Sequence, residues 1–110
     1  MTLEDKLTEQ LEDARKHAEK GEVCYMNFFL TSAKDHAAGI GKDISAKVAE
    51  LETIGYTNGI PVELAYAREY AEERDVHGMN FSLILVNDYA AKIGKDMTAE
   101  VAEIRAIIEQ

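Results

Sequence analysis

Apolar residues recur in this chain at spacings of three and four with polar residues between them, which is the pattern of an amphipathic α-helix. Three such stripes follow one another in the first half of the chain. Each stripe would give one helix an apolar face, so the pattern predicts three helices. The stripes are Leu7, Leu11, Ala14 and Ala18, then Val23, Met26, Leu30, Ala33, Ala37 and Ile40, then Ile44, Val48 and Leu51.

The second half of the chain repeats the first. Residues 11–54 return without a gap as residues 64–107, a shift of 53 positions, and roughly half of the aligned residues are identical. A repeat of this length is typical of one supersecondary unit that is copied and stacked. We therefore expect an all-α fold of two tandem three-helix repeats, packed into one compact helical domain over residues 1–110.

The stripes and their flanking residues predict six helices, at 3–20, 22–40, 43–54, 61–74, 75–93 and 96–109. The first repeat unit then covers residues 2–55 and the second covers 61–109. Gly55 is expected to end the third helix, and residues 55–60 are expected to link the units. Pro61 would lie in the first turn of the fourth helix, where its missing N–H costs nothing.

Glycines mark the expected helix ends, because glycine adopts positive φ more readily than other residues. Gly41 and Gly94 directly follow the last apolar position of a middle helix, so positive φ is predicted at both. Gly21 is expected to end the first helix in the same way. Arg74 replaces this glycine in the second copy, so different backbone angles or a kink are expected there.

Asp43 and Asp96 follow two of these glycines and stand where the third helix of each unit would begin. An aspartate at the N-cap accepts a hydrogen bond from a backbone amide that the helix leaves unpaired. Both residues are therefore predicted N-caps. Thr2 and Asp5 have the spacing of a capping box at the start of the first helix.

The predicted helix 75–93 is apolar on more than one side. It carries the run Leu83–Val86 and a second apolar flank with Phe81 and Ile84. A helix that is apolar all round is usually buried, so we expect this helix to be the central element. The equivalent helix of the first copy has Thr31 in place of Ile84 and is expected to be less buried.

Length and cysteine content favour one domain in a reducing compartment. A chain of 110 residues buries enough surface to fold without covalent staples. Cys24 is the only cysteine, so no intramolecular disulfide can form. The N-terminus lacks the basic head and apolar run of a signal peptide, and no long apolar stretch could span a membrane. We expect a soluble, cytoplasmic protein.

The charge balance argues against two classes of partner. Lys and Arg number 12 and Asp and Glu number 21, which gives a net charge of −9. Such a surface repels phosphate groups and no basic stripe offsets it, so nucleic acids and anionic membranes are not expected partners. A solvated acidic surface is the simplest interpretation, and recruitment of a basic partner or mimicry of a nucleic acid is the alternative.

Acidic pairs are the main candidates for metal chemistry. Glu19 with Glu22 and Glu72 with Asp75 are three residues apart and recur in both copies, and all-helical nucleotide pyrophosphohydrolases hold magnesium with such pairs. Both pairs span an expected turn, where Glu22 and Asp75 are better explained as helix-start residues. The histidines lack the spacing of paired metal ligands in helical bundles. We expect no metal, no cofactor and no catalytic site.

Arg15 and Arg68 occupy equivalent polar positions in the first helix of each unit. In an antiparallel hairpin that turns near residue 21, Arg15 faces Phe28, and Arg68 likewise faces Phe81. We expect each arginine stem to cover its ring, with an acidic residue one turn away as ionic partner, Glu19 in the first copy.

Four aromatic residues are candidates for an interface: Tyr25 and Phe29 in the first copy, and Tyr66 and Tyr70 in the second. Exposed aromatic side chains are enriched where proteins bind one another. Two repeats are also fewer than a stable array usually needs. Surplus apolar surface is therefore expected to pair two chains as a homodimer.

These observations favour a small non-catalytic helical-repeat module for protein interaction or scaffolding, because repeats build surfaces and the sequence shows no reactive grouping. Two alternatives stay open. One is a small helical magnesium-dependent enzyme or ligand-binding bundle that uses the acidic pairs. The other is an acidic inhibitor of a basic protein.

Overall fold

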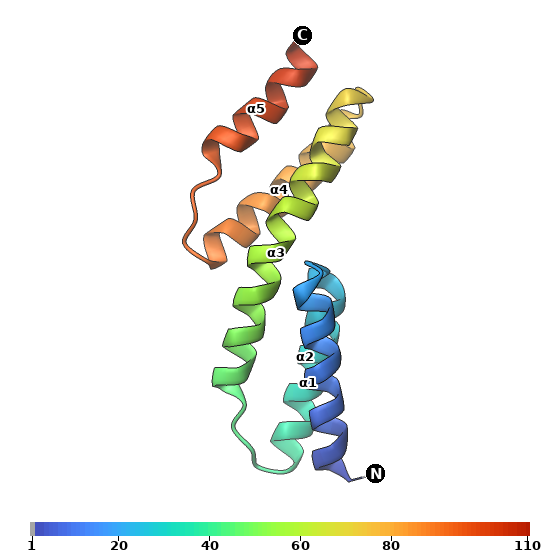
Figure 1. Cartoon of the computed structure of the whole chain (residues 1–110), viewed down its shortest axis with the longest axis vertical. Helices are drawn as coiled ribbons and strands as arrows, with labels where there is room; N and C mark the ends of the chain where they lie inside the picture. The colour runs from blue at the N-terminus through green and yellow to red at the C-terminus, as the bar shows by residue number, and fades with distance from the viewer. Residues whose placement is uncertain (1) are drawn as a thin grey trace. The chain divides into compact units, whose positions relative to one another are not determined.

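The computed structural model describes residues 2–110, and within this range it is all-helical, with five helices and no strand (Figure 1). None of these helices is long and apolar enough to cross a membrane. The helices are α1 (Leu3–Glu19), α2 (Val23–Gly39), α3 (Ser45–Glu72), α4 (Val76–Lys92) and α5 (Thr98–Glu109).

The chain divides into two compact units, and the boundary falls inside α3. The first unit ends at Asn58 and the second begins at Gly59. Helices α1 and α2 and the N-terminal part of α3 form the first unit, and the C-terminal part of α3, α4 and α5 form the second.

The prediction of two separate helices at 43–54 and 61–74 is wrong, because α3 runs through both. Gly55 does not end a helix, the expected linker 55–60 is helical, and Pro61 lies in the interior of α3. Tyr56 and Ile60, four residues apart, are both buried and continue the apolar stripe through the expected linker. Burial of these side chains outweighs the local preference of glycine and proline for a break.

Two contacts in the first unit hold the middle of α3 in place. The side chain of Met26 on α2 packs against Gly55, so a Cβ atom at this position would require the Sδ and Cε atoms of Met26 to move. The side-chain amide of Asn58 donates hydrogen bonds to the carbonyl oxygens of Ala18 (3.3 Å) and Glu19 (3.2 Å). It thereby pairs carbonyl groups that the end of α1 leaves open.

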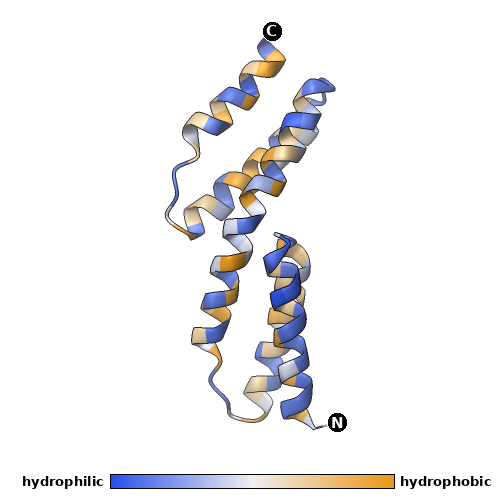
Figure 2. Cartoon of the chain, viewed as in Figure 1, coloured by the Kyte–Doolittle hydropathy of each residue, from blue (hydrophilic) through white to orange (hydrophobic). Residues whose placement is uncertain are grey.

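Each unit has its own apolar core. In the first, α1 and α2 lie side by side, and Leu7 packs against Ala33 and Ala37. Small alanines let the two backbones approach closely, and Figure 2 shows that the rest of α1 is largely hydrophilic. The core of the second unit includes a cluster of Ala67, Ala71, Met79, Leu83 and Ile104.

Helix 75–93, expected from its apolar sides to be the central element, buries one of these sides and exposes the other. Leu83 is fully buried, as predicted, but Phe81 and Ile84 on the other side of α4 are each 64% exposed. The core of the second unit takes up the face of α4 that carries Met79 and Leu83. The opposite face is therefore left uncovered, although several of its residues are apolar.

Three glycines end or follow helices with positive φ: 72° at Gly21, 65° at Gly41 and 68° at Gly94. The prediction for Gly41 and Gly94 is confirmed. The prediction for Arg74 is wrong, because this residue adopts the glycine-like conformation, with φ of 63°. The amide of the following residue, Asp75, donates to the carbonyl of Tyr70 at 2.8 Å, which closes the same turn as in the first copy.

The prediction of Asp43 and Asp96 as N-caps is wrong by one residue in both copies, because each aspartate lies two residues before the first residue of its helix. The N-cap of α5 is Met97, and Asp96 precedes it. Oδ1 of Asp96 accepts hydrogen bonds from the hydroxyl and the amide of Thr98. These two bonds hold the pKa of Asp96 below its ordinary value. Asp43 likewise lies two residues before Ser45, the first residue of α3. The capping box of Thr2 and Asp5 is present at α1.

Candidate functional site

The most distinctive surface of the first unit is a cluster of four rings, His17, Tyr25, Phe28 and Phe29, which we call the aromatic patch. The His17 imidazole on α1 stacks on two rings of α2, with centroid distances of 5.1 Å to Tyr25 and 5.4 Å to Phe29. Phe28 meets Phe29 edge to face at 5.3 Å. The patch exists because Tyr25 and Phe29 are one turn apart on α2 and His17 lies beside both.

Much of the aromatic patch is accessible. Tyr25 is 60% exposed and Phe28 is 69% exposed. Oε1 of Glu22 lies 2.9 Å from Nδ1 of His17 and orients the imidazole between its two aromatic neighbours. Exposed large aromatic side chains held in fixed positions are typical of surfaces that bind other proteins.

The second unit does not reproduce this patch. Tyr70 replaces His17, and it packs against the core while its ring covers Gly78, which replaces Tyr25. Ser82 replaces Phe29 and is buried. Of the four predicted interface residues, the structure therefore brings Tyr25 and Phe29 together, leaves Tyr66 half exposed, and places Tyr70 against the core.

Where the first unit has Phe29 of the aromatic patch, the second unit has a polar contact at the buried Ser82. Ser82 hydrogen-bonds to the carboxyl group of Glu63. Burial raises the pKa of Glu63 above its ordinary value, and the bond from Ser82 opposes this only in part. The equivalent position in the first unit is Gln10, whose Nε2 donates to Oγ of Ser32 at 2.6 Å.

Two open hollows adjoin the aromatic patch. The first, of about 350 Å³, is lined by Phe29 with side chains of α1. The second, of about 450 Å³, is lined by Phe28 with other residues of α2. The first hollow contains Lys6, Glu9, Gln10, Asp13 and Phe29, and the second contains Cys24, Asn27, Phe28, Thr31, Ser32 and Asp35.

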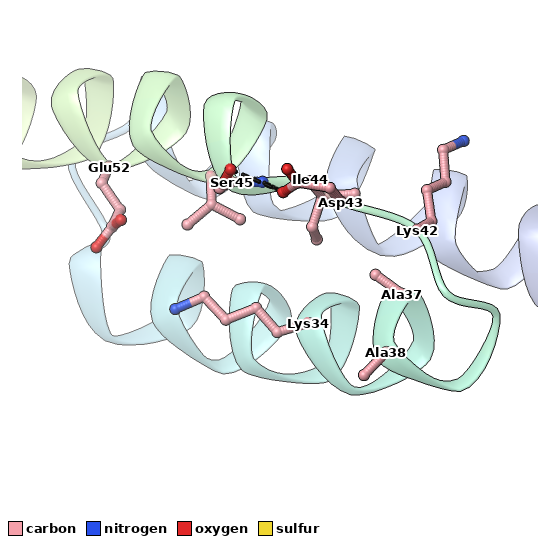
Figure 3. Close-up of a pocket in the computed structure, with 9 residues that line it drawn as sticks. Lys34, Ala37, Ala38, Lys42, Asp43, Ile44, Ser45 and Glu52 are labelled. Atoms are coloured by element: carbon pink, nitrogen blue, oxygen red, sulfur yellow. Dashed lines mark hydrogen bonds between the residues drawn. The ribbon is translucent and has the colours of Figure 1, made fainter.

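A third hollow, of about 450 Å³, lies where α2 ends and α3 begins (Figure 3). Lys34 on α2 and Glu52 on α3 line one end, and Lys42 points away from the other residues. Asp43 accepts hydrogen bonds from the amide (2.9 Å) and hydroxyl (2.7 Å) of Ser45, which lower its pKa. The carboxylate of Asp43 thus pairs the first amide of α3 and serves a local contact at the start of that helix.

The acidic residues considered for metal binding serve local contacts or lie in the open. Glu22 contacts His17, and Asp75 accepts a hydrogen bond from the amide of Gly78 at 3.0 Å as the N-cap of α4. Glu19 and Glu72 are exposed. Among residues 2–110, no three His, Cys, Asp or Glu side chains lie close enough together to hold a metal ion.

The two repeated arginines have other partners than predicted. Arg15 pairs with Glu50 on α3 at 2.9 Å, and Arg68 pairs with Glu103 on α5 at 3.7 Å. The bond from Arg15, with Lys47 nearby, lowers the pKa of Glu50. The expected ionic partner, Glu19, is not the one used.

The repeat itself contained the signal for this ion pair. Glu50 and Glu103 are related by the same shift of 53 residues as Arg15 and Arg68. Charged positions of opposite sign that are kept in both copies are natural partners when each unit folds alike. The predicted hairpin contains only the first two helices of each unit, so it could not indicate a partner on the third.

Comparison with known proteins finds no matching family, no similar curated sequence and no similar solved structure.

Proposed function

We propose that this chain is a non-catalytic helical module for protein interaction or scaffolding, and that the aromatic patch is its binding surface. The exposure of Tyr25 and Phe28 carries this proposal. Both side chains leave a large apolar area in contact with water, and a partner that covers them would gain free energy from its burial.

The magnesium-dependent alternative has less support. Glu22 and Asp75 are engaged in the local contacts described above. The third alternative is an acidic inhibitor of a basic protein, and the net charge of −9 supports it. For location we propose the cytoplasm, because Cys24 is an exposed thiol, and such thiols persist in reducing compartments.

The proposal is tested by affinity capture from the native cell extract with the full chain and two variants. In the first variant, Tyr25→Ser and Phe28→Ser remove the exposed rings of the aromatic patch. The matched control is Phe81→Ser, at the position equivalent to Phe28 and similarly exposed. We expect the wild type and the control to retain the same partners and the double variant to lose them.

Circular dichroism of all three proteins checks that they fold, since none of the substituted side chains is buried. Capture of the same proteins by the double variant would contradict the proposal. A metal measurement on the captured wild type would favour the enzyme alternative if it showed stoichiometric magnesium that the Glu19→Gln and Glu22→Gln variant lacks.

A further inference from the structure

Three of the carboxylates beside the aromatic patch lack ionic partners, unlike others in the same unit. Glu22 contacts His17, and Glu50 pairs with Arg15. By contrast, Glu9, Asp13 and Asp35 have no ion pair or hydrogen bond from their side chains among residues 2–110.

These three residues occupy the two hollows that flank the rings. Glu9 and Asp13 line the first hollow with Phe29, and Asp35 lines the second with Phe28. Lys6 is the one basic residue among the side chains that line either hollow, so the two together carry an excess of negative charge. The surface therefore combines exposed rings with unpaired carboxylates on both sides of them.

We propose that the aromatic patch and its two hollows bind a basic segment of a partner protein, whose lysine or arginine side chains reach the carboxylates while its apolar side chains cover the rings. This inference rests on the proposed interaction function and specifies the chemistry of the partner. Arginine and lysine are the side chains that fit both features, because they pair with carboxylates and also stack on aromatic faces.

Two further observations support a basic occupant. The whole chain carries a net charge of −9, which attracts a cationic segment from a distance and repels an acidic one. In addition, Gln10 lines the first hollow, and its oxygen Oε1 is buried without a hydrogen-bond partner among the described residues. Lysine and arginine are rich in hydrogen-bond donors, so they suit a hollow whose lining includes a residue with an unpaired acceptor.

The second unit serves as an internal comparison. Val62 and Tyr66 occupy the positions of Glu9 and Asp13, and Gly78 and Ser82 occupy those of Tyr25 and Phe29. The equivalent surface thus keeps an exposed phenylalanine, Phe81, but loses two of the carboxylates and two of the rings. Binding of a basic segment is therefore assigned to the first unit alone.

The test is a selection of random peptides of about twelve residues, about three helical turns, on the immobilised full chain. Peptides that bind are sequenced, and the most enriched are synthesised with a fluorophore for affinity measurements. We expect the bound peptides to be enriched in Lys and Arg interleaved with apolar residues. Their affinity should fall as salt concentration rises, because exposed charges are screened.

Three variants locate the site. Neutralisation by Glu9→Gln, Asp13→Asn and Asp35→Asn should weaken the selected peptides about tenfold or more, and Tyr25→Ser with Phe28→Ser should do the same, as for typical anchor residues of interfaces. The control, Phe81→Ser with Asp88→Asn in the second unit, should leave affinity unchanged. Circular dichroism confirms that each variant is folded.

The outcomes separate this inference from the function on which it rests. Peptides without basic residues that still need Tyr25 and Phe28 would overturn the basic partner and leave an interaction surface. Basic peptides that bind the neutralised variant equally well would also overturn it, because the carboxylates would then play no part. Peptides whose affinity is unchanged by Tyr25→Ser with Phe28→Ser would contradict both the inference and the proposed binding surface.

Discussion

Arg74 holds a backbone conformation that other side chains avoid, and its own side chain offsets that strain. Its φ of 63° would favour glycine, as at the equivalent Gly21. The guanidinium Nη1 donates to the carbonyl oxygens of Ile107 (2.9 Å) and Ile108 (2.8 Å), near the C-terminus of α5. The guanidinium group pairs carbonyl oxygens that the end of the helix leaves open, and its positive charge is stabilised by the negative end of the helix dipole.

Two substitutions of Arg74 separate strain from capping. Arg74→Ala loses the hydrogen bonds and keeps the strained backbone, whereas Arg74→Gly loses the bonds but relieves the strain. We expect urea unfolding to show the alanine variant less stable than the glycine variant by about 1 kcal/mol. Equal stabilities would show that the positive φ carries no strain at this site.

Glu63 is a residue whose charge opposes folding. Its pKa is raised by burial, so the folded state binds its proton more tightly than the unfolded state. The resulting stabilisation is present below the ordinary pKa of glutamate and is lost as pH rises through the raised value. Glu63→Gln keeps a hydrogen-bonding partner for Ser82 without a charge, so it should raise the melting temperature near neutral pH.

The sign can be checked by repeating the melting measurement at about pH 3, where both the folded and unfolded carboxyl groups are protonated. The advantage of Glu63→Gln should shrink there. Glu73→Gln is the control, because the side chain of Glu73 is exposed. A glutamine variant that is less stable than the wild type near neutral pH would contradict the assigned cause.

At the scale of the helices, the sequence pattern predicted position and type well but not continuity. Helices α1, α2, α4 and α5 begin and end within a few residues of the predicted spans. The fusion of the third and fourth predicted helices was missed because Gly55 and Pro61 are local signals for a break. Burial of Tyr56 and Ile60 is a tertiary effect, and no local rule contains it.

The candidate surface was predicted only in part for a similar reason. Aromatic residues at Tyr25 and Phe29 could be read from the sequence as interface candidates. The stacking of His17 on both rings depends on how α1 packs against α2. The apolar pattern within a single helix does not specify this packing. The exposure of Phe28 and Phe81 was also not predictable, because the same 3.6-residue pattern fits a ring that faces either water or a neighbour.

Pro61 offers a test of the continuous helix. In the interior of α3 it cannot donate a hydrogen bond to the carbonyl of Thr57, and its ring crowds that carbonyl. Pro61→Ala should therefore increase stability by about 1–3 kcal/mol, and Pro61→Gly by less, since glycine is the poorer helix former. Both effects can be measured by urea unfolding with helicity followed by circular dichroism.

The opposite result would be informative about α3. If Pro61 lay in a first helical turn, as the sequence suggested, its replacement by alanine would lower stability slightly, because proline restricts the unfolded chain. A loss of stability in the alanine variant would thus contradict a continuous α3. Pro61 is exposed, so no packing is lost in either variant.

For the whole molecule, the net charge bears on self-association. The homodimer expected from the sequence stays a prediction, and two copies that each carry −9 repel one another. We expect light scattering at micromolar concentration to show a dimer fraction that grows with added salt, since salt screens this repulsion. Tyr25→Ser and Tyr66→Ser, tested separately, should identify which exposed ring takes part. A monomer at every salt concentration would contradict the prediction.

The single cysteine gives the native chain a built-in reporter position. Cys24 is exposed and lines the same hollow as Phe28 and Asp35. A thiol-reactive fluorophore or spin label would attach there alone, with no engineered substitution elsewhere. Changes in its emission or mobility would follow occupancy of that hollow in real time, so binding kinetics can be recorded on the otherwise unaltered protein.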